Sequence, residues 1–152
     1  MMRAPSFWQN PPQSPGWQAR MMAPLGALYA AATARRVKQM PDVTPSCPII
    51  CVGNINAGGT GKTPTVIALI ELLQSRNVHV VSRGYGGTKT GPLRVDERAH
   101  KAKDVGDEPL LISAFAPTWI AKYRSEGVRA AEVDGAEIII LDDGFQNPSV
   151  AK

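Results

Sequence analysis

The residues with the clearest chemical potential form a glycine-rich segment that ends in Lys62 and Thr63 and follows an apolar run at residues 48–53. Glycines let successive backbone N–H groups turn inward around an anion, and a helix that follows presents its positive N-terminal end. A lysine at this place reaches the β- and γ-phosphates of a nucleoside triphosphate, and the threonine hydroxyl suits Mg²⁺. The residues predicted to bind ATP are Asn56, Ala57, Gly58, Gly59, Thr60, Gly61, Lys62 and Thr63.

One end of this segment departs from the usual spacing, which would place a glycine where the chain has Asn56. Asparagine tolerates left-handed backbone geometry, so the departure is mild. A glycine-rich turn that binds nothing is the alternative. The apolar run at residues 65–70, which follows Pro64, predicts the helix that a phosphate-binding loop requires and therefore favours binding.

Two adjacent acids, Asp142 and Asp143, follow a second apolar run at residues 138–141. Phosphate-loop proteins place the acid that holds Mg²⁺ directly or through water at such a strand end, so we predict this role for Asp142, with a simple cap as the alternative. Asp143 and Gln146 continue the loop beside the phosphates and are candidate orienting groups.

Two other segments each allow a structural and a functional interpretation. Asp107 and Glu108 precede Pro109 at a predicted helix start, a pattern typical of ordinary capping as well as of catalysis. Arg83 stands before glycines at the end of a predicted strand, where it could form a turn or grip phosphate bidentately. His79, in a strand pattern, and His100, in a polar loop, have no evident partner.

Apolar runs that alternate with helical patterns predict an α/β fold, a P-loop NTPase-like mostly parallel sheet with helices on both faces. Ligands in such folds bind beyond the carboxyl ends of the strands. The predicted strands cover residues 48–53, 78–82, 118–120 and 137–141. The predicted helices cover residues 65–76, 107–116 and 125–133, and a glycine-rich, mobile connection is expected over residues 83–106.

Charge is unevenly distributed along the 152 residues, of which 43% are hydrophobic and 20% charged. The formal charge of +4 comes from residues 1–41, which hold five basic residues and no acid. This pattern argues against a nucleic-acid-binding surface and favours a local attraction to an anionic membrane surface. Cys47 and Cys51 lack zinc spacing and are interpreted as buried or edge thiols in a reducing compartment.

Residues 1–41 are predicted to form a proline-rich arm and an amphipathic helix from Trp17 to Lys38, with a kink at Pro24, and residues 42–152 the nucleotide-binding domain. The uncharged stretch at residues 21–34 reaches only about 21 Å, short of the ~30 Å hydrocarbon core, so no transmembrane span is expected. Basic residues follow the apolar stretch, which argues against a signal peptide. The helix either docks on its own domain or lies in a membrane interface.

Four segments taken together resemble tetraacyldisaccharide 4'-kinases, the kinases of lipid A biosynthesis. These segments are residues 53–54 with 58–64, residues 82–87, residues 105–110 and residues 142–146, and residues 3–8 also fit. The resemblance implies transfer of the ATP γ-phosphate to the 4'-hydroxyl of a tetraacylated disaccharide 1-phosphate, a lipid A precursor. It also implies a peripheral location at the cytoplasmic face of the bacterial inner membrane, where lipopolysaccharide synthesis begins.

Carried over by motif, the resemblance implies that Asp107 is the catalytic acid and that Glu108 and Asp142 assist the metal. The predicted catalytic residues are thus Asp107, Lys62 and Asp143. The predicted Mg²⁺ ligands are Thr63, Glu108 and Asp142, and the predicted substrate-binding residues are Arg83, Tyr85 and Gln146.

Two features of the chain depart from the family pattern. Asn147 occupies a position where many members have histidine, and members continue through a second lobe that holds a catalytic histidine and part of the nucleotide clamp.

Two alternative functions are considered. One is a membrane-associated ATPase switch of the partitioning or septum-site type, but those proteins carry a signature lysine at the position where this chain has Ala57. The other is a nucleotide-binding fragment without turnover. Acyl-chain preference and oligomeric state are left open.

Overall fold

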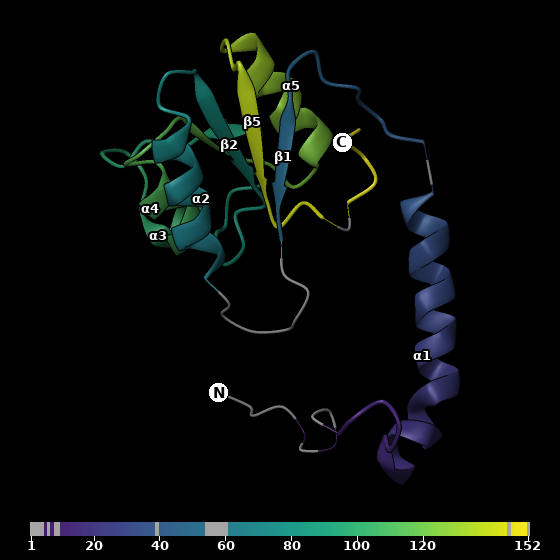
Figure 1. Ribbon diagram of the computed structural model, residues 1–152. Coiled ribbons are helices and arrows are strands. Elements are labelled where there is room, and N and C mark those ends of the chain that lie inside the picture. Colours follow the sequence, from purple (N-terminus) through teal and green to yellow (C-terminus); the bar gives the residue numbers. More distant parts are fainter. Residues whose placement is uncertain are drawn as a thin grey trace. The chain divides into compact units, whose positions relative to one another are not determined.

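The computed structural model describes residues 5, 7, 10–38, 40–53, 61–145 and 147–151. The chain forms two compact units, Met1–Gln39 and Met40–Lys152. In the described part of the chain, the first unit contains one α-helix, and the second contains a five-stranded sheet with the other helices (Figure 1).

The helix of the first unit, α1, spans Gly16–Val37 and contains Pro24. Its large apolar side chains are between 50% and 70% exposed: Trp17, Met21, Met22, Leu25, Leu28 and Tyr29. Spacings of three and four residues bring Trp17, Met21, Leu25 and Leu28 to one side of the helix. Among the helices in the described part of the chain, none is both long and apolar enough to cross a membrane.

The sheet of the second unit has the strand order β1-β5-β2-β4-β3. Its strands are β1 (Ile49–Val52), β2 (Val78–Ser82), β3 (Leu93–Arg94), β4 (Thr118–Ile120) and β5 (Ile138–Asp142). The pairs β1–β5, β2–β5 and β2–β4 are parallel, and β3 runs antiparallel to β4. The helices are α2 (Lys62–Leu72), α3 (Ala102–Val105), α4 (Asp107–Ile112) and α5 (Arg124–Val133).

Helices cover both faces of the sheet because neighbouring strand residues point to opposite sides. On one face, Val80 and Ile140 pack with Val66 of α2 and Ile112 of α4. On the other face, Val81, Ile139 and Leu141 pack with Val128 and Ala131 of α5. Figure 1 shows α2 and α4 on one side of the strands and α5 on the other. The predicted α/β fold with a mostly parallel sheet is therefore confirmed.

The segment at residues 83–106, which the sequence analysis treats as a connection, contains two further elements, β3 and α3. Strand β3 depends on pairing with β4, where Leu93 faces Ile120 and Arg94 faces Trp119. Such a contact is not visible in a local hydrophobic pattern. The helix that starts at Asp107 also ends earlier than predicted, at Ile112, and hydrogen-bonded turns follow it.

Candidate active site

A polar cavity of about 580 Å³ opens where the carboxyl ends of β2 and β5 meet the first residues of α2, α4 and α5. This is the edge at which parallel α/β sheets bind ligands. The residues that line the cavity are Lys62, Ser82, Arg83, Tyr85, Asp107, Glu108, Pro109, Arg124, Asp142 and Asp143.

Lys62 enters this cavity as the first residue of α2. Gly61, which precedes it, has φ 82°, a left-handed conformation that favours glycine over residues with a Cβ. The Lys62 ammonium lies 3.1 Å from the Asp143 carboxylate, and 22% of the Lys62 side chain is exposed. A partly buried cation is thereby held at the mouth of the predicted phosphate loop. The rest of that loop, residues 56–60, lies outside the described residues.

Asp142 is the last residue of β5 and is buried. Its Oδ2 accepts a hydrogen bond of 3.0 Å from the Ser82 hydroxyl at the end of β2. The chain then turns at Asp143, which has φ 55° and donates its N–H to the Val52 carbonyl at 2.8 Å. This turn directs the exposed Asp143 carboxylate to Lys62, while Asp142 is buried.

Arg83 and Tyr85 reach the same cavity as Asp107 and Glu108 because two glycine-containing segments pack closely. A Cβ added to Gly106 would lie 2.6 Å from the Tyr85 carbonyl oxygen, and one added to Gly87 would lie 2.7 Å from that of Asp104. The Lys89 N–H donates to the Asp104 carbonyl at 2.8 Å and reinforces this contact. Gly87, one of the glycines after Arg83, therefore has a packing role here.

Arg124, which the sequence analysis missed, lines the cavity and is only 4% exposed. Its guanidinium donates to the Ala121 carbonyl at 3.3 Å and to the Asp142 carbonyl at 3.0 Å. Its Nε has no hydrogen-bond partner among the described residues. Burial lowers the pKa of Arg124, and the nearby Asp142 carboxylate partly opposes that effect. Ser82 was missed as well, although both residues lie just at or after the carboxyl end of a strand.

The structure thus brings together seven predicted site residues around one cavity: Lys62, Arg83, Tyr85, Asp107, Glu108, Asp142 and Asp143. Thr63 follows Lys62 in α2 without lining the cavity, and Gln146 lies outside the described residues. Within the described ranges, no three His, Cys, Asp or Glu side chains cluster closely enough to hold a metal ion by themselves. Mg²⁺ in nucleotide sites is bound by one or two carboxylates together with phosphate oxygens, and the carboxylates that line this cavity fit that pattern.

Both histidines have partners, contrary to the expectation from the sequence. The Trp119 indole N–H donates to Nδ1 of the buried His79 at 3.2 Å, and the Asp96 backbone N–H donates to Nδ1 of His100 at 3.0 Å. Burial lowers the pKa of His79; Asp134 opposes this shift and Arg94 adds to it. Neither histidine lines the cavity.

Cys47 and Cys51 are half-buried, in agreement with the prediction of buried or edge thiols. Burial, followed by the Glu132 carboxylate, raises the pKa of Cys47.

Comparison with known proteins agrees with this geometry. The chain is 65% identical over 153 residues to a tetraacyldisaccharide 4'-kinase of Dinoroseobacter shibae and 60% identical over 152 residues to one of a Jannaschia species. Each match covers 99% of this chain but 45% of the relative, so the chain spans less than half the length of these proteins. These relatives favour the kinase over the ATPase switch.

A solved structure gives the same result at the level of the fold. It is described as the apo form of LpxK from Aquifex aeolicus in complex with ATP, and it is 29% identical to this chain. The superposition has a TM-score of 0.77 and covers 89% of this chain and 47% of that one. The sequence profile of the tetraacyldisaccharide-1-P 4'-kinases matches residues 18–152. The chain therefore belongs to the tetraacyldisaccharide-1-P 4'-kinase family.

Proposed function

We propose that this chain is the nucleotide-binding part of an ATP-dependent kinase that phosphorylates the 4'-hydroxyl of a tetraacyldisaccharide 1-phosphate in lipid A synthesis. The observation that carries the proposal is the convergence of Lys62, Asp107 and Asp142 on one polar cavity in a member of this family. The similarity to an Aquifex aeolicus structure described with ATP supports ATP as the phosphate donor.

The phosphates of ATP are bound by residues 56–63, and Lys62 supplies the positive charge. In the structure this charge already faces a carboxylate, Asp143, at 3.1 Å, so phosphate oxygens would compete with or join that ion pair. Phosphoryl transfer depends on positioning and charge stabilisation, which suits a preformed arrangement of this kind. Asp143 is assigned the role of orienting Lys62 and the transferred group.

Asp107 is assigned to the acceptor hydroxyl, because it is exposed and lines the cavity as the first residue of α4. Its Oδ1 accepts the Glu108 backbone N–H at 3.0 Å, which orients the carboxylate. Arg83, Tyr85 and Gln146 are assigned to substrate binding.

Thr63, Glu108 and Asp142 are the residues that would hold Mg²⁺. Bound Mg²⁺ neutralises the charge that develops on the phosphates during transfer. Within the chain itself, the Ser82 hydroxyl holds the Asp142 carboxylate in place at 3.0 Å.

The first unit is assigned to the membrane. Its helix α1 exposes Trp17, Met21, Leu25 and Leu28 beside several basic residues, as an interfacial helix would. The proposal therefore treats residues 1–41 as an arm and interface helix, and residues 42–152 as the kinase domain. It places the protein peripherally at the cytoplasmic face of the inner membrane, where an anionic lipid surface and the lipid substrate are its partners.

A chimera tests the kinase proposal, because the relatives are more than twice as long as this chain. This chain would replace the matching segment of the Dinoroseobacter shibae relative, and transfer of γ-labelled phosphate from ATP to tetraacyldisaccharide 1-phosphate would be measured. We expect transfer by the chimera and none by the same chimera with Lys62→Ala. A folded chimera without transfer, beside an active relative, would overturn the proposal.

A further inference from the structure

Arg124 connects the ends of two strands, β4 and β5, which lie on either side of β2 in the sheet. It is the first residue of α5, and its guanidinium donates to the carbonyl of Ala121, just after β4, and to that of Asp142, the last residue of β5. It is 4% exposed, and among the described residues it forms no ion pair with a carboxylate. A buried charge whose printed hydrogen bonds go to backbone carbonyls, with the Asp142 carboxylate near but not ion-paired, costs folding free energy, so a structural role alone explains it poorly.

The carbonyl that Arg124 holds lies at the start of the aspartate turn, which we define as residues 142–144. The turn is held from two sides: Arg124 binds the Asp142 carbonyl, and the Val52 carbonyl accepts the N–H of Asp143. Asp143 adopts φ 55° between these two contacts, a conformation that residues with a Cβ disfavour. The two carboxylates of the turn then point to different partners, Ser82 and Lys62.

We propose that Arg124 is a positioning residue that fixes the aspartate turn and thereby the directions of the Asp142 and Asp143 carboxylates. The inference rests on the proposed function, since it concerns how the Mg²⁺ and lysine sites of the proposed kinase are held. Arg124 acts through the Asp142 backbone and does not itself bind the metal. Loss of a group that orients a metal ligand weakens metal affinity typically 10–100-fold, which sets the expected scale.

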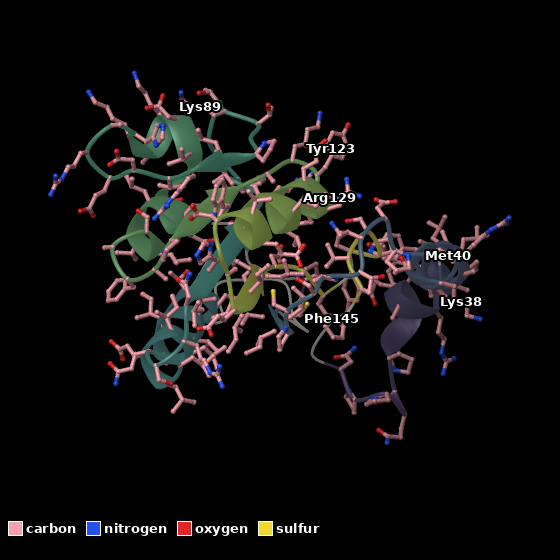
Figure 2. All side chains as sticks on the ribbon, turned by 90° about the horizontal axis from the view of Figure 1, so that it is seen from above. Lys38, Met40, Lys89, Tyr123, Arg129 and Phe145 are labelled. Carbon is pink, nitrogen blue, oxygen red and sulfur yellow. The ribbon has the colours of Figure 1, made fainter. Side chains whose placement is uncertain are left out.

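The test measures ATP binding by the full 152-residue chain as a function of Mg²⁺ concentration. In Arg124→Gln, we expect the Mg²⁺ concentration at half-maximal ATP binding to rise about tenfold or more, with binding recovered at high Mg²⁺. Arg124→Lys keeps the charge and one donor group, so an intermediate rise is expected. The matched control is Arg129→Gln, because Arg129 is exposed on the same helix (Figure 2), does not line the cavity and donates to the Asp42 carbonyl at 3.2 Å.

Melting curves of the same variants distinguish positioning from simple stabilisation. A lower midpoint with an unchanged Mg²⁺ dependence in folded Arg124→Gln or Arg124→Lys would overturn the inference, as would an equal shift in Arg129→Gln. If Arg124→Gln does not fold, the result for Arg124→Lys decides. If neither variant folds at any Mg²⁺ concentration, the role of Arg124 is structural and the inference fails. A wild-type chain that binds no ATP would instead refute the proposed function.

Discussion

The Lys62 ammonium and the Asp143 carboxylate meet at the mouth of the cavity, 3.1 Å apart. Replacement of Lys62 by Ala should abolish ATP binding, because the phosphates lose their main cationic contact. The melting midpoint should change little, since an ion pair with a largely exposed partner stabilises a fold by at most about 1 kcal/mol. Calorimetric titration with Mg-ATP measures the first effect, and Lys89→Ala, at an exposed lysine (Figure 2), is the control. Unchanged affinity in Lys62→Ala would contradict the phosphate-loop assignment.

Asp107 and Asp142 should fail in different ways when each is changed to Asn in the chimera. Asp107 is exposed in the cavity and assigned to the acceptor hydroxyl, so Asp107→Asn should lower turnover roughly 10²–10⁴-fold and leave ATP binding largely intact. Asp142 is buried and bonded to Ser82, so Asp142→Asn should raise the Mg²⁺ requirement. Steady-state kinetics over a range of Mg²⁺ concentrations separate the two. Equal losses that do not depend on Mg²⁺ would refute this division.

His79 should make the fold sensitive to mild acid. Burial lowers its pKa below the ordinary value of 6.5, so the folded chain keeps it neutral where the unfolded chain takes up a proton. The stabilising contribution of neutral His79 is complete above about pH 6.5. As the pH falls from there toward the folded pKa, the free energy of unfolding decreases by at most about 1.4 kcal/mol per pH unit. Protonation of Nδ1 would also remove the acceptor for Trp119. Urea unfolding between pH 5 and 7.5 gives the free energy of unfolding at each pH. This free energy should depend less steeply on pH in His79→Gln than in the original chain, and an identical pH dependence would count against this account.

At the scale of elements, the position of α4 depends on the close contact between residues 84–87 and 104–106. Gly106 has φ 94° and ψ 154°, a region almost restricted to glycine, and an added Cβ would overlap the Tyr85 carbonyl oxygen. We expect Gly106→Ala to lower the free energy of unfolding by about 2–4 kcal/mol, through backbone strain and overpacking together. Chemical denaturation measures this change.

The control is Gly86→Ala, because Gly86 also has a positive φ, 82°, but open space at the Cβ position. It should lose only the strain, about 1–2 kcal/mol. If the two variants were equally stable, the contact between the two segments would not be what positions Asp107 beside Arg83.

At the scale of the whole molecule, deletion of the first unit tests whether it binds membranes. Removal of residues 1–38 should weaken binding to anionic vesicles and leave the melting midpoint of the second unit nearly unchanged, because that unit has its own core on both faces of the sheet. Each basic residue near anionic lipid contributes about 1 kcal/mol and exposed apolar side chains add burial, so binding should also fall at high salt. Sedimentation with vesicles at two salt concentrations measures this. If neither salt nor the deletion changed vesicle binding, the interfacial helix would be refuted. If the deletion lowered the melting midpoint and left vesicle binding unchanged, the helix would instead be docked on its own domain.

The sequence by itself determined the elements that are encoded locally. The apolar runs at residues 78–82 and 118–120 coincide with β2 and β4, because a strand buried on both faces needs a continuous apolar stretch. The order of glycines, Lys62 and a following helix likewise predicted that a helix follows the loop, since a phosphate loop is contiguous in sequence, although α2 spans Lys62–Leu72 and not residues 65–76. The family resemblance, carried by four short segments in order, was confirmed for the same reason.

Only the tertiary structure decided which of these groups meet. The Ser82–Asp142 hydrogen bond joins residues 60 positions apart, and the contacts of Lys62 with Asp143 and of Arg124 with the Asp142 carbonyl also cross between elements. Each depends on the strand order β1-β5-β2-β4, which places the end of β5 between the ends of β1 and β2. Strand β3 was missed because a two-residue strand exists only through its partner. Local patterns specify elements, but long-range strand pairing decides which polar groups share a site.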